Sequence, residues 1–196
     1  KALVAHWSFD DGHASVARDV TGRGNDGQIL RCRPVDGRVG KALDLSGGGY
    51  VELGKPRGLP IANRPFTVMA WILPRAPTGV VVARGGAFCG YSLYLYQGIP
   101  KFGIHRVEDG PAYIAAAPEA AGDSWVHLAG VVREERIELY VDGALAATEA
   151  IPGLIPSDCG QGMQIGFDAA NSPAEITDAL DGVIDEVKVY SEALPE

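Results

Sequence analysis

Apolar and polar side chains alternate along most of this chain with the two-residue period of half-buried β-strands. Clusters of glycine, proline, asparagine and aspartate separate the alternating runs, and no long run has helical periodicity. This pattern indicates an all-β fold, specifically a two-sheet antiparallel β-sandwich. The predicted strands are Leu3–Phe9, Gly27–Leu30, Ala42–Leu45, Tyr50–Leu53, Phe66–Leu73, Val80–Arg84, Tyr91–Tyr96, Lys101–Val107, Ala112–Ala116, Val126–Arg133, Ile137–Val141, Leu145–Glu149, Met163–Phe167 and Gly182–Tyr190.

Two turn sequences predict antiparallel neighbours in this sandwich. Asp142-Gly143 lies between two alternating runs, and an Asp-Gly pair in that position is the strongest short-range signal for a hairpin. Gln97-Gly98-Ile99-Pro100 separates another two such runs. We therefore expect a hairpin at each of these turns.

The alternation also assigns side chains to the two faces of a sheet, because consecutive residues of a strand point to opposite sides. Tyr94 and Tyr96 are expected to point away from the core, as are Lys101 and His105 on the next strand. Arg84 is expected to end its strand at the rim. Tyrosine rings and basic groups would then share one exposed surface.

The chain length of 196 residues fits one domain spanning residues 1–196. A formal net charge of −8 disfavours nucleic acid and anionic membranes as partners, because both bind dense Lys and Arg clusters. The chain begins with Lys1 and has neither a charged-then-apolar leader nor a run of 18 apolar residues. We expect a processed or excised soluble piece with no membrane insertion.

Cys32, Cys89 and Cys159 lie far apart in the sequence, and no C-x-x-C motif occurs. A zinc site or a thioredoxin-like redox motif is therefore not expected. Two interpretations stay open: three buried thiols, or one disulfide with one free thiol.

A series of sequence blocks, in this order along the chain, resembles a known family. The blocks are Leu3–Asp10, Asp19–Gly27, Gly40–Leu45, Phe66–Ile72, Trp125–Ala129, Leu139–Gly143 and Leu180–Tyr190. Over nearly its whole length the chain resembles the laminin-G-like domains of the concanavalin A-like lectin/glucanase superfamily. The resemblance implies a jelly-roll of two curved sheets. It also implies a domain of the kind that is often appended to secreted bacterial glycoside hydrolases, sialidases, sulfatases or adhesins.

The motifs of hydrolytic enzymes are missing from the sequence. Glucanases with this fold carry Glu-x-Asp-x-Glu or Glu-x-Asp-x-x-Glu, because glycoside hydrolysis usually needs two carboxylates about 5–10 Å apart. Neither spacing occurs, and Gly90–Tyr94 lacks the second glycine of a nucleophile elbow. His127 lies between apolar neighbours and is expected on the core side, and His6 and His13 have no companion at metal-ligand spacing. We therefore expect no enzymatic activity.

The resemblance further implies a structural calcium ion on the convex side of the jelly-roll, where the first strand, an early glycine-rich turn and the last strand meet. The matching positions are Asp10, the turn from Asn25 to Gly27, the carbonyls near Gly48, and Asp185. Carboxylate and carbonyl oxygens are the ligands that Ca²⁺ prefers. A buried carboxylate at Asp185 would be costly without a cation or several donors. The alternative, that Asp185 simply accepts backbone N–H bonds, stays open.

The predicted function is non-catalytic carbohydrate binding, by an accessory module of a secreted or cell-surface bacterial protein with a polysaccharide or glycan as partner. An attached catalytic domain in the parent protein is compatible with this role. Tyrosine rings suit the C–H face of a pyranose, and basic groups suit hydroxyl, sulfate or uronate groups. The expected ligand-binding residues are Tyr94, Tyr96, Lys101, His105, Arg84 and Arg106, with loops around Asp109, Asp168 and Asn171 at the rim.

Two alternatives to this function stay open. The tyrosines are also consistent with ordinary cross-strand packing on a wet sheet face. The same scaffold also hosts protein-interaction and adhesion modules with no sugar ligand, because fold does not determine function.

Overall fold

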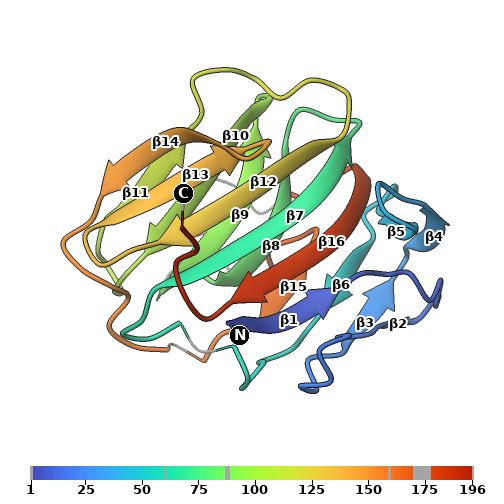
Figure 1. Cartoon of the computed structure of the whole chain (residues 1–196), viewed down its shortest axis with the longest axis horizontal. Helices are drawn as coiled ribbons and strands as arrows, with labels where there is room; N and C mark the ends of the chain where they lie inside the picture. Colours follow the sequence, from blue (N-terminus) through green and yellow to red (C-terminus); the bar gives the residue numbers. More distant parts are fainter. Residues whose placement is uncertain (1, 60, 87–88, 159, 170–177, 196) are drawn as a thin grey trace.

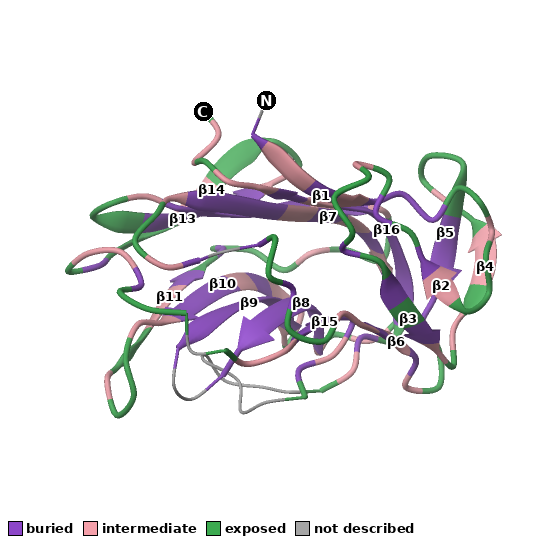
Figure 2. Ribbon diagram, turned by 90° about the horizontal axis from the view of Figure 1, so that it is seen from below, coloured by how far each residue is buried: buried purple, intermediate pink, exposed green. Residues whose placement is uncertain are grey.

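The computed structural model describes residues 2–59, 61–86, 89–158, 160–169 and 178–195. Within these ranges the chain forms two eight-stranded antiparallel sheets that stack face to face, as the two layers in Figure 2 show. This arrangement confirms the predicted all-β sandwich of jelly-roll type. No helix in the described ranges is long and apolar enough to cross a membrane.

Sheet A is the layer that faces the viewer in Figure 1. Its strands follow the order β14 (Ala144–Ala150), β13 (Arg136–Val141), β12 (Val126–Val132), β7 (Phe66–Pro74), β16 (Gly182–Tyr190), β5 (Lys41–Asp44) and β4 (Arg33–Asp36), and β1 (Leu3–Trp7) also pairs with β16. The C-terminal strand is therefore central, and it pairs with β7, β5 and β1.

Sheet B forms the second layer. Its strands follow the order β11 (Ala112–Ala116), β10 (Ile99–His105), β9 (Gly90–Tyr96), β8 (Gly79–Gly85), β15 (Met163–Ile165), β6 (Tyr50–Glu52), β3 (Gly27–Leu30) and β2 (Val16–Ala17). The core lies between the sheets, and its largest fully buried side chains include Trp7, Phe66, Phe102, Ile72 and Leu93.

Both predicted hairpins are confirmed. Asp142 and Gly143 have φ angles of 50° and 81°, and Gln97 and Gly98 have φ angles of 50° and 83°. Positive φ at both central residues is the geometry of a type I′ turn, whose twist matches that of the flanking strands. The turns join β13 to β14 and β9 to β10.

Two strands were not predicted from the sequence. β2 has only two residues, and β4 has four, of which the second is Pro34. β4 lies at the edge of sheet A, where a proline costs little because its missing N–H is not needed for pairing.

The cysteines agree with the interpretation of one disulfide and one free thiol. Cys89 is disulfide-bonded, whereas Cys32 is a free thiol. Burial raises the pKa of the Cys32 thiol to about 12, so this thiol stays protonated and unreactive at neutral pH. Cys159 lies outside the described residues.

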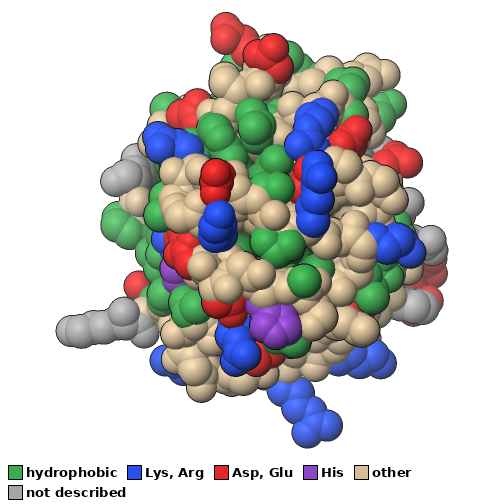
Figure 3. Space-filling model, turned by 90° about the vertical axis from the view of Figure 1, so that its right-hand side faces the viewer, with side chains coloured by type: hydrophobic (Ala, Val, Ile, Leu, Met, Phe, Trp, Pro, Cys, Tyr) green, Lys and Arg blue, Asp and Glu red, His purple; other side chains and the backbone are tan. Residues whose placement is uncertain are grey.

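Charged side chains of both signs are scattered over the end of the sandwich where β2 to β5 lie. Figure 3 shows acidic and basic groups interspersed over this surface. Neighbouring opposite charges weaken each other's field, so this end presents no extended field of one sign.

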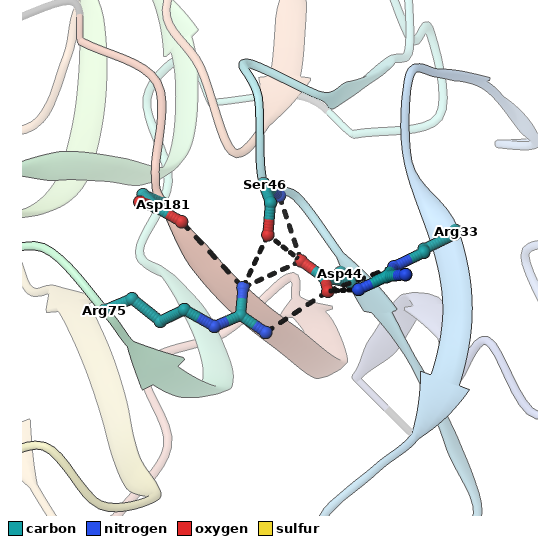
Figure 4. Close-up of polar contacts among 5 residues, drawn as sticks. All are labelled: Arg33, Asp44, Ser46, Arg75 and Asp181. Atoms are coloured by element: carbon teal, nitrogen blue, oxygen red, sulfur yellow. Dashed lines mark hydrogen bonds and ion pairs between the residues drawn. The ribbon is translucent and has the colours of Figure 1, made fainter.

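A buried carboxylate at the end of β5 ties three separate strands together (Figure 4). The side chain of Asp44 is 1% exposed and forms ion pairs with Arg75, at 2.8 Å, and with Arg33, at 3.1 Å. Arg75 directly follows β7 and also lies 3.8 Å from Asp181, just before β16. Hydrogen bonding from Arg75 holds the pKa of Asp44 well below its usual range.

Asp44→Asn is expected to lower the free energy of unfolding at pH 7 by about 1–3 kcal/mol, because charged hydrogen bonds to Arg75 and Arg33 are lost. The folded-state pKa of Asp44 is depressed, so its contribution is complete above the unfolded pKa near 3.9 and disappears as the pH falls. Urea unfolding of both proteins between pH 3 and pH 7 measures this difference.

Arg33→Gln is the matched control, because the Arg33 side chain is 77% exposed and its pair should contribute less than about 1 kcal/mol. Equal stability of the parent and Asp44→Asn at pH 7 would contradict a stabilising role for this cluster.

Candidate functional site

The sequence-predicted surface lies on the outer side of sheet B, and it is only partly formed. Lys101 pairs across the strands with Tyr94, and its ammonium group lies 4.9 Å from the centre of the Tyr96 ring. Tyr94 itself is completely buried, because it packs in a second apolar cluster with Val80 and Ala83. The expectation of an exposed Tyr94 is therefore wrong, although its predicted face is right.

The other predicted basic groups do not join this surface. Arg84 is 4% exposed and forms an ion pair of 2.7 Å with Asp158, because it lies opposite the core residue Tyr91 rather than at an open rim. The His105 ring nitrogen Nε2 contacts the Gly110 carbonyl at 2.6 Å. Both side chains are thus held by contacts within the protein, and the Nε and Nη1 of Arg84 are buried without a hydrogen-bond partner among the described residues.

Arg106 and the residues of the predicted rim do not join this surface either. The Nε of Arg106 donates to the Leu154 carbonyl at 3.1 Å. Asp168 is buried and Asp109 occupies an exposed turn, whereas Asn171 lies outside the described residues. The six predicted ligand-binding residues thus do not form one continuous site, and only Tyr96 and Lys101 remain as a small, half-buried pair.

A more open aromatic cleft lies on the outer side of sheet A. Core positions on β7 alternate with outward ones, so Trp71 points away from the core between the buried Ala70 and Ile72. The same alternation on β12 turns His127 outward, opposite Trp71. The ring centroids of Trp71 and His127 are 5.1 Å apart, with the rings nearly edge to face. The sequence-based expectation that His127 lies on the core side is therefore wrong.

Charged and aromatic neighbours complete this cleft. The Arg38 guanidinium lies 4.8 Å from the centre of the Trp71 ring. Trp125, Asp142 and Gly143 line the remaining walls of a depression of about 530 Å³. We call this depression the tryptophan cleft; it comprises Arg38, Trp71, Trp125, His127, Asp142 and Gly143.

The electrostatics of the cleft favour a neutral His127. Burial is the largest cause of its lowered pKa, and the positive charge of Lys188 lowers it further, against the opposite effect of Asp142. The Asp142 carboxylate accepts the His127 backbone N–H at 2.9 Å, which fixes the hairpin beside the ring. A neutral imidazole can both donate and accept a hydrogen bond, so the cleft combines flat apolar rings with polar groups.

Two carboxylates support the loop that carries Arg38. Asp185 is fully buried and accepts the Val39 backbone N–H at 2.9 Å, and Asp10 accepts the Lys41 backbone N–H at 2.9 Å. The pKa of Asp185 is raised to about 6, mainly by burial and in part by the charges of Glu186 and Asp10, against the opposite effect of the backbone hydrogen bonds from Val39 and Glu186. A Cβ at Gly37 would lie 2.6 Å from an Asp185 oxygen, so the loop passes very close to this carboxylate.

These two carboxylates do not resemble a glycosidase pair. Asp185 has a raised pKa, as a general acid needs, but no part of its side chain is exposed to a substrate. Its oxygens accept backbone N–H groups from Val39 and Glu186. The pair is thus placed to hold the loop rather than to transfer protons to a ligand.

The four predicted calcium ligands are only partly brought together. Asp10 and Asp185 face the same loop, but Asn25 donates to Asp19 at 2.8 Å and accepts the Trp7 indole N–H at 2.8 Å. The Gly48 carbonyl accepts from Arg31 at 3.0 Å. In the described ranges, no group of three or more His, Cys, Asp or Glu side chains is arranged to hold a metal ion.

Sequence reasoning missed the tryptophan cleft, although its signal was present. The alternation that assigns Phe66, Val68 and Ala70 to the core also turns Trp71 outward. Arg38 carried no such signal, because its approach to Trp71 depends on a loop distant in the sequence.

Comparisons with known proteins agree with this architecture. The Laminin_G_3 family model, described as the Concanavalin A-like lectin/glucanases superfamily, matches residues 45–196. A search of curated protein sequences finds no match.

Several solved structures share the fold. Domain 4 of AbnA, a GH43 extracellular arabinanase from Geobacillus stearothermophilus, in complex with arabinotriose, is 23% identical with a TM-score of 0.77, covering 99% of this chain and 94% of that one. The Ruminococcus gnavus IT-sialidase CBM40 bound to α2,3-sialyllactose is 15% identical with a TM-score of 0.58, covering 75% of this chain and 91% of that one.

A toxin domain is similar over part of its length. The binding domain of Paraclostridial Mosquitocidal Protein 1 is 16% identical with a TM-score of 0.77, and the match covers 99% of this chain but 50% of that one. At these identities, the likenesses establish the fold alone.

Proposed function

Because the chain belongs to the concanavalin A-like lectin/glucanases superfamily, we propose that it is a non-catalytic carbohydrate-binding module and that the tryptophan cleft is its sugar site. The observation that carries the proposal is the pairing of Trp71 and Trp125 with polar groups in one open depression. Indole rings offer flat apolar area to the C–H face of a sugar. Asp142 and Arg38 supply an acceptor and a donor for hydroxyl groups.

The cleft is better suited to this role than the surface on sheet B. Tyr94 is buried there, and Lys101 already lies over the Tyr96 ring, so little aromatic area is left for a ligand. In the tryptophan cleft, Arg38 and Asp142 are exposed and both indole rings are half-buried. A ligand can therefore contact rings and charged groups together.

An extracellular accessory role is part of the same proposal. Disulfides persist in oxidising compartments, and Cys89 is disulfide-bonded. The arabinanase domain that shares this fold belongs to an extracellular enzyme, which supports a parent protein that joins such a module to a catalytic domain.

Trp71→Ala and Trp125→Ala are each expected to weaken sugar binding roughly tenfold, because one stacked ring is removed. The measurement is calorimetric titration with arabinotriose and sialyllactose, together with affinity gels that contain neutral and sulfated polysaccharides. Tyr96→Ala is the control for the surface on sheet B and should bind like the parent. Melting curves identify any variant that has lost its fold.

Loss of binding in Tyr96→Ala, with both tryptophan variants unchanged, would move the site to sheet B. If the parent protein binds no sugar in the panel but retains a protein partner in pull-down experiments, this result would contradict sugar binding and favour an adhesion module.

We further propose that Asp10 and Asp185 hold a structural Ca²⁺. Both carboxylates face the same loop, and a cation beside Asp185 would favour its charged form, which burial disfavours most and the charges of Glu186 and Asp10 disfavour further. Carboxylate oxygens also match the hard character of the ion. Asn25 and Gly48 are left out of this site, because their polar groups serve Asp19, Trp7 and Arg31.

Addition of Ca²⁺ to chelator-treated protein is expected to raise the melting temperature by several degrees, because an ion that binds only the folded state stabilises it. Asp185→Asn should lose this response, and Mg²⁺ at the same concentration should produce a smaller one. A melting temperature that is identical in calcium and in chelator would exclude the site.

A further inference from the structure

An apolar groove lies next to the tryptophan cleft on the outer side of sheet A. Met69 on β7 and Ala129 and Val131 on β12 line it, and Leu194 and Pro195 of the C-terminal segment complete it. Its volume is about 160 Å³. Figure 1 shows the C-terminal segment leaving β16 and crossing β7 toward β12 and β13.

The C-terminal segment is fixed in this position. The Leu194 backbone N–H donates to the Thr67 hydroxyl at 3.1 Å, and that hydroxyl donates to the Glu192 carbonyl at 2.9 Å. Arg133 donates to the Leu194 carbonyl at 2.9 Å. The groove is therefore bounded on one side by a hydrogen-bonded strap.

The groove offers few polar contacts to a ligand. The Thr67 hydroxyl is used by the strap, and the Tyr140 hydroxyl donates to Glu138 at 3.0 Å. His127, at the boundary with the tryptophan cleft, is the third polar side chain of the lining, and the other side chains there, including Met69 and Val131, are apolar. A sugar ring placed here would leave hydroxyl groups without partners, which costs free energy, whereas an apolar group would not.

The groove and the tryptophan cleft are adjacent, because His127 and Gly143 line both. An apolar cavity of about 150 Å³ is large enough for a benzene ring, so the groove accommodates a short alkyl chain or one aromatic ring. We propose that the groove binds the apolar aglycone of a glycoside whose sugar occupies the tryptophan cleft. This inference rests on the proposed function of the cleft.

The test compares methyl and hexyl α-L-arabinofuranoside, and the corresponding pair of glycosides for any other sugar that the panel selects. Each buried methylene contributes about fourfold to affinity, so the hexyl glycoside should bind the parent at least about tenfold more tightly than the methyl glycoside. Calorimetric titration below the micelle concentration measures both.

Ala129→Leu fills the groove with a larger side chain and should abolish the hexyl advantage while methyl glycoside binding stays unchanged. Ala150→Leu, an exposed substitution on β14, should keep the hexyl advantage. Trp71→Ala should weaken both glycosides.

A second measurement does not depend on any variant. Intermolecular nuclear Overhauser effects between the hexyl methylenes and the methyl groups of Met69 and Ala129 are expected in the parent complex. Their absence, or equal affinity of the two glycosides, overturns the inference while leaving sugar binding in place. Failure of both glycosides and of every sugar in the panel overturns the proposed function as well.

Discussion

The outer surface of sheet A depends on a β-bulge in β16. Asp185 lies opposite Trp71 and Lys188 lies opposite Met69, so three steps along β16 match two steps along β7. Glu186 adopts a φ of 51° to absorb the extra residue. Without the bulge, Asp185 and Lys188 would point to opposite faces of the sheet, because side chains alternate along a regular strand.

The bulge has two consequences for this face. Asp185 comes to lie beneath the loop that carries Arg38, and Lys188 comes close enough to depress the pKa of His127. Glu186 is also drawn into contacts with His6, at 2.7 Å, and with Lys188, at 3.0 Å. A single irregularity in the central strand therefore sets much of the charge pattern around the tryptophan cleft.

Alternation along the strands predicted most of the fold, because each strand must bury one face. It predicted correctly that Tyr94 faces away from the main core, but it carries no information on whether that face is covered. Alternation also could not predict the role of Asp44, because Arg33 and Arg75 reach this carboxylate from two other segments of the chain. The short edge strands were missed because strands of two residues, or of four residues that include a proline, leave no period to detect.

The loop from Gly37 to Lys41 links the two proposed sites. Its backbone N–H groups at Val39 and Lys41 donate to Asp185 and Asp10, whereas the side chain of Arg38, the residue just before Val39, lies over Trp71. The backbone of this short segment thus binds the two carboxylates, and its Arg38 side chain lines the aromatic cleft. A Cβ at Gly37 would collide with Asp185, so only glycine lets the loop pass this close to that carboxylate. The position of Arg38 in the cleft is therefore a consequence of the two acidic groups that support its backbone.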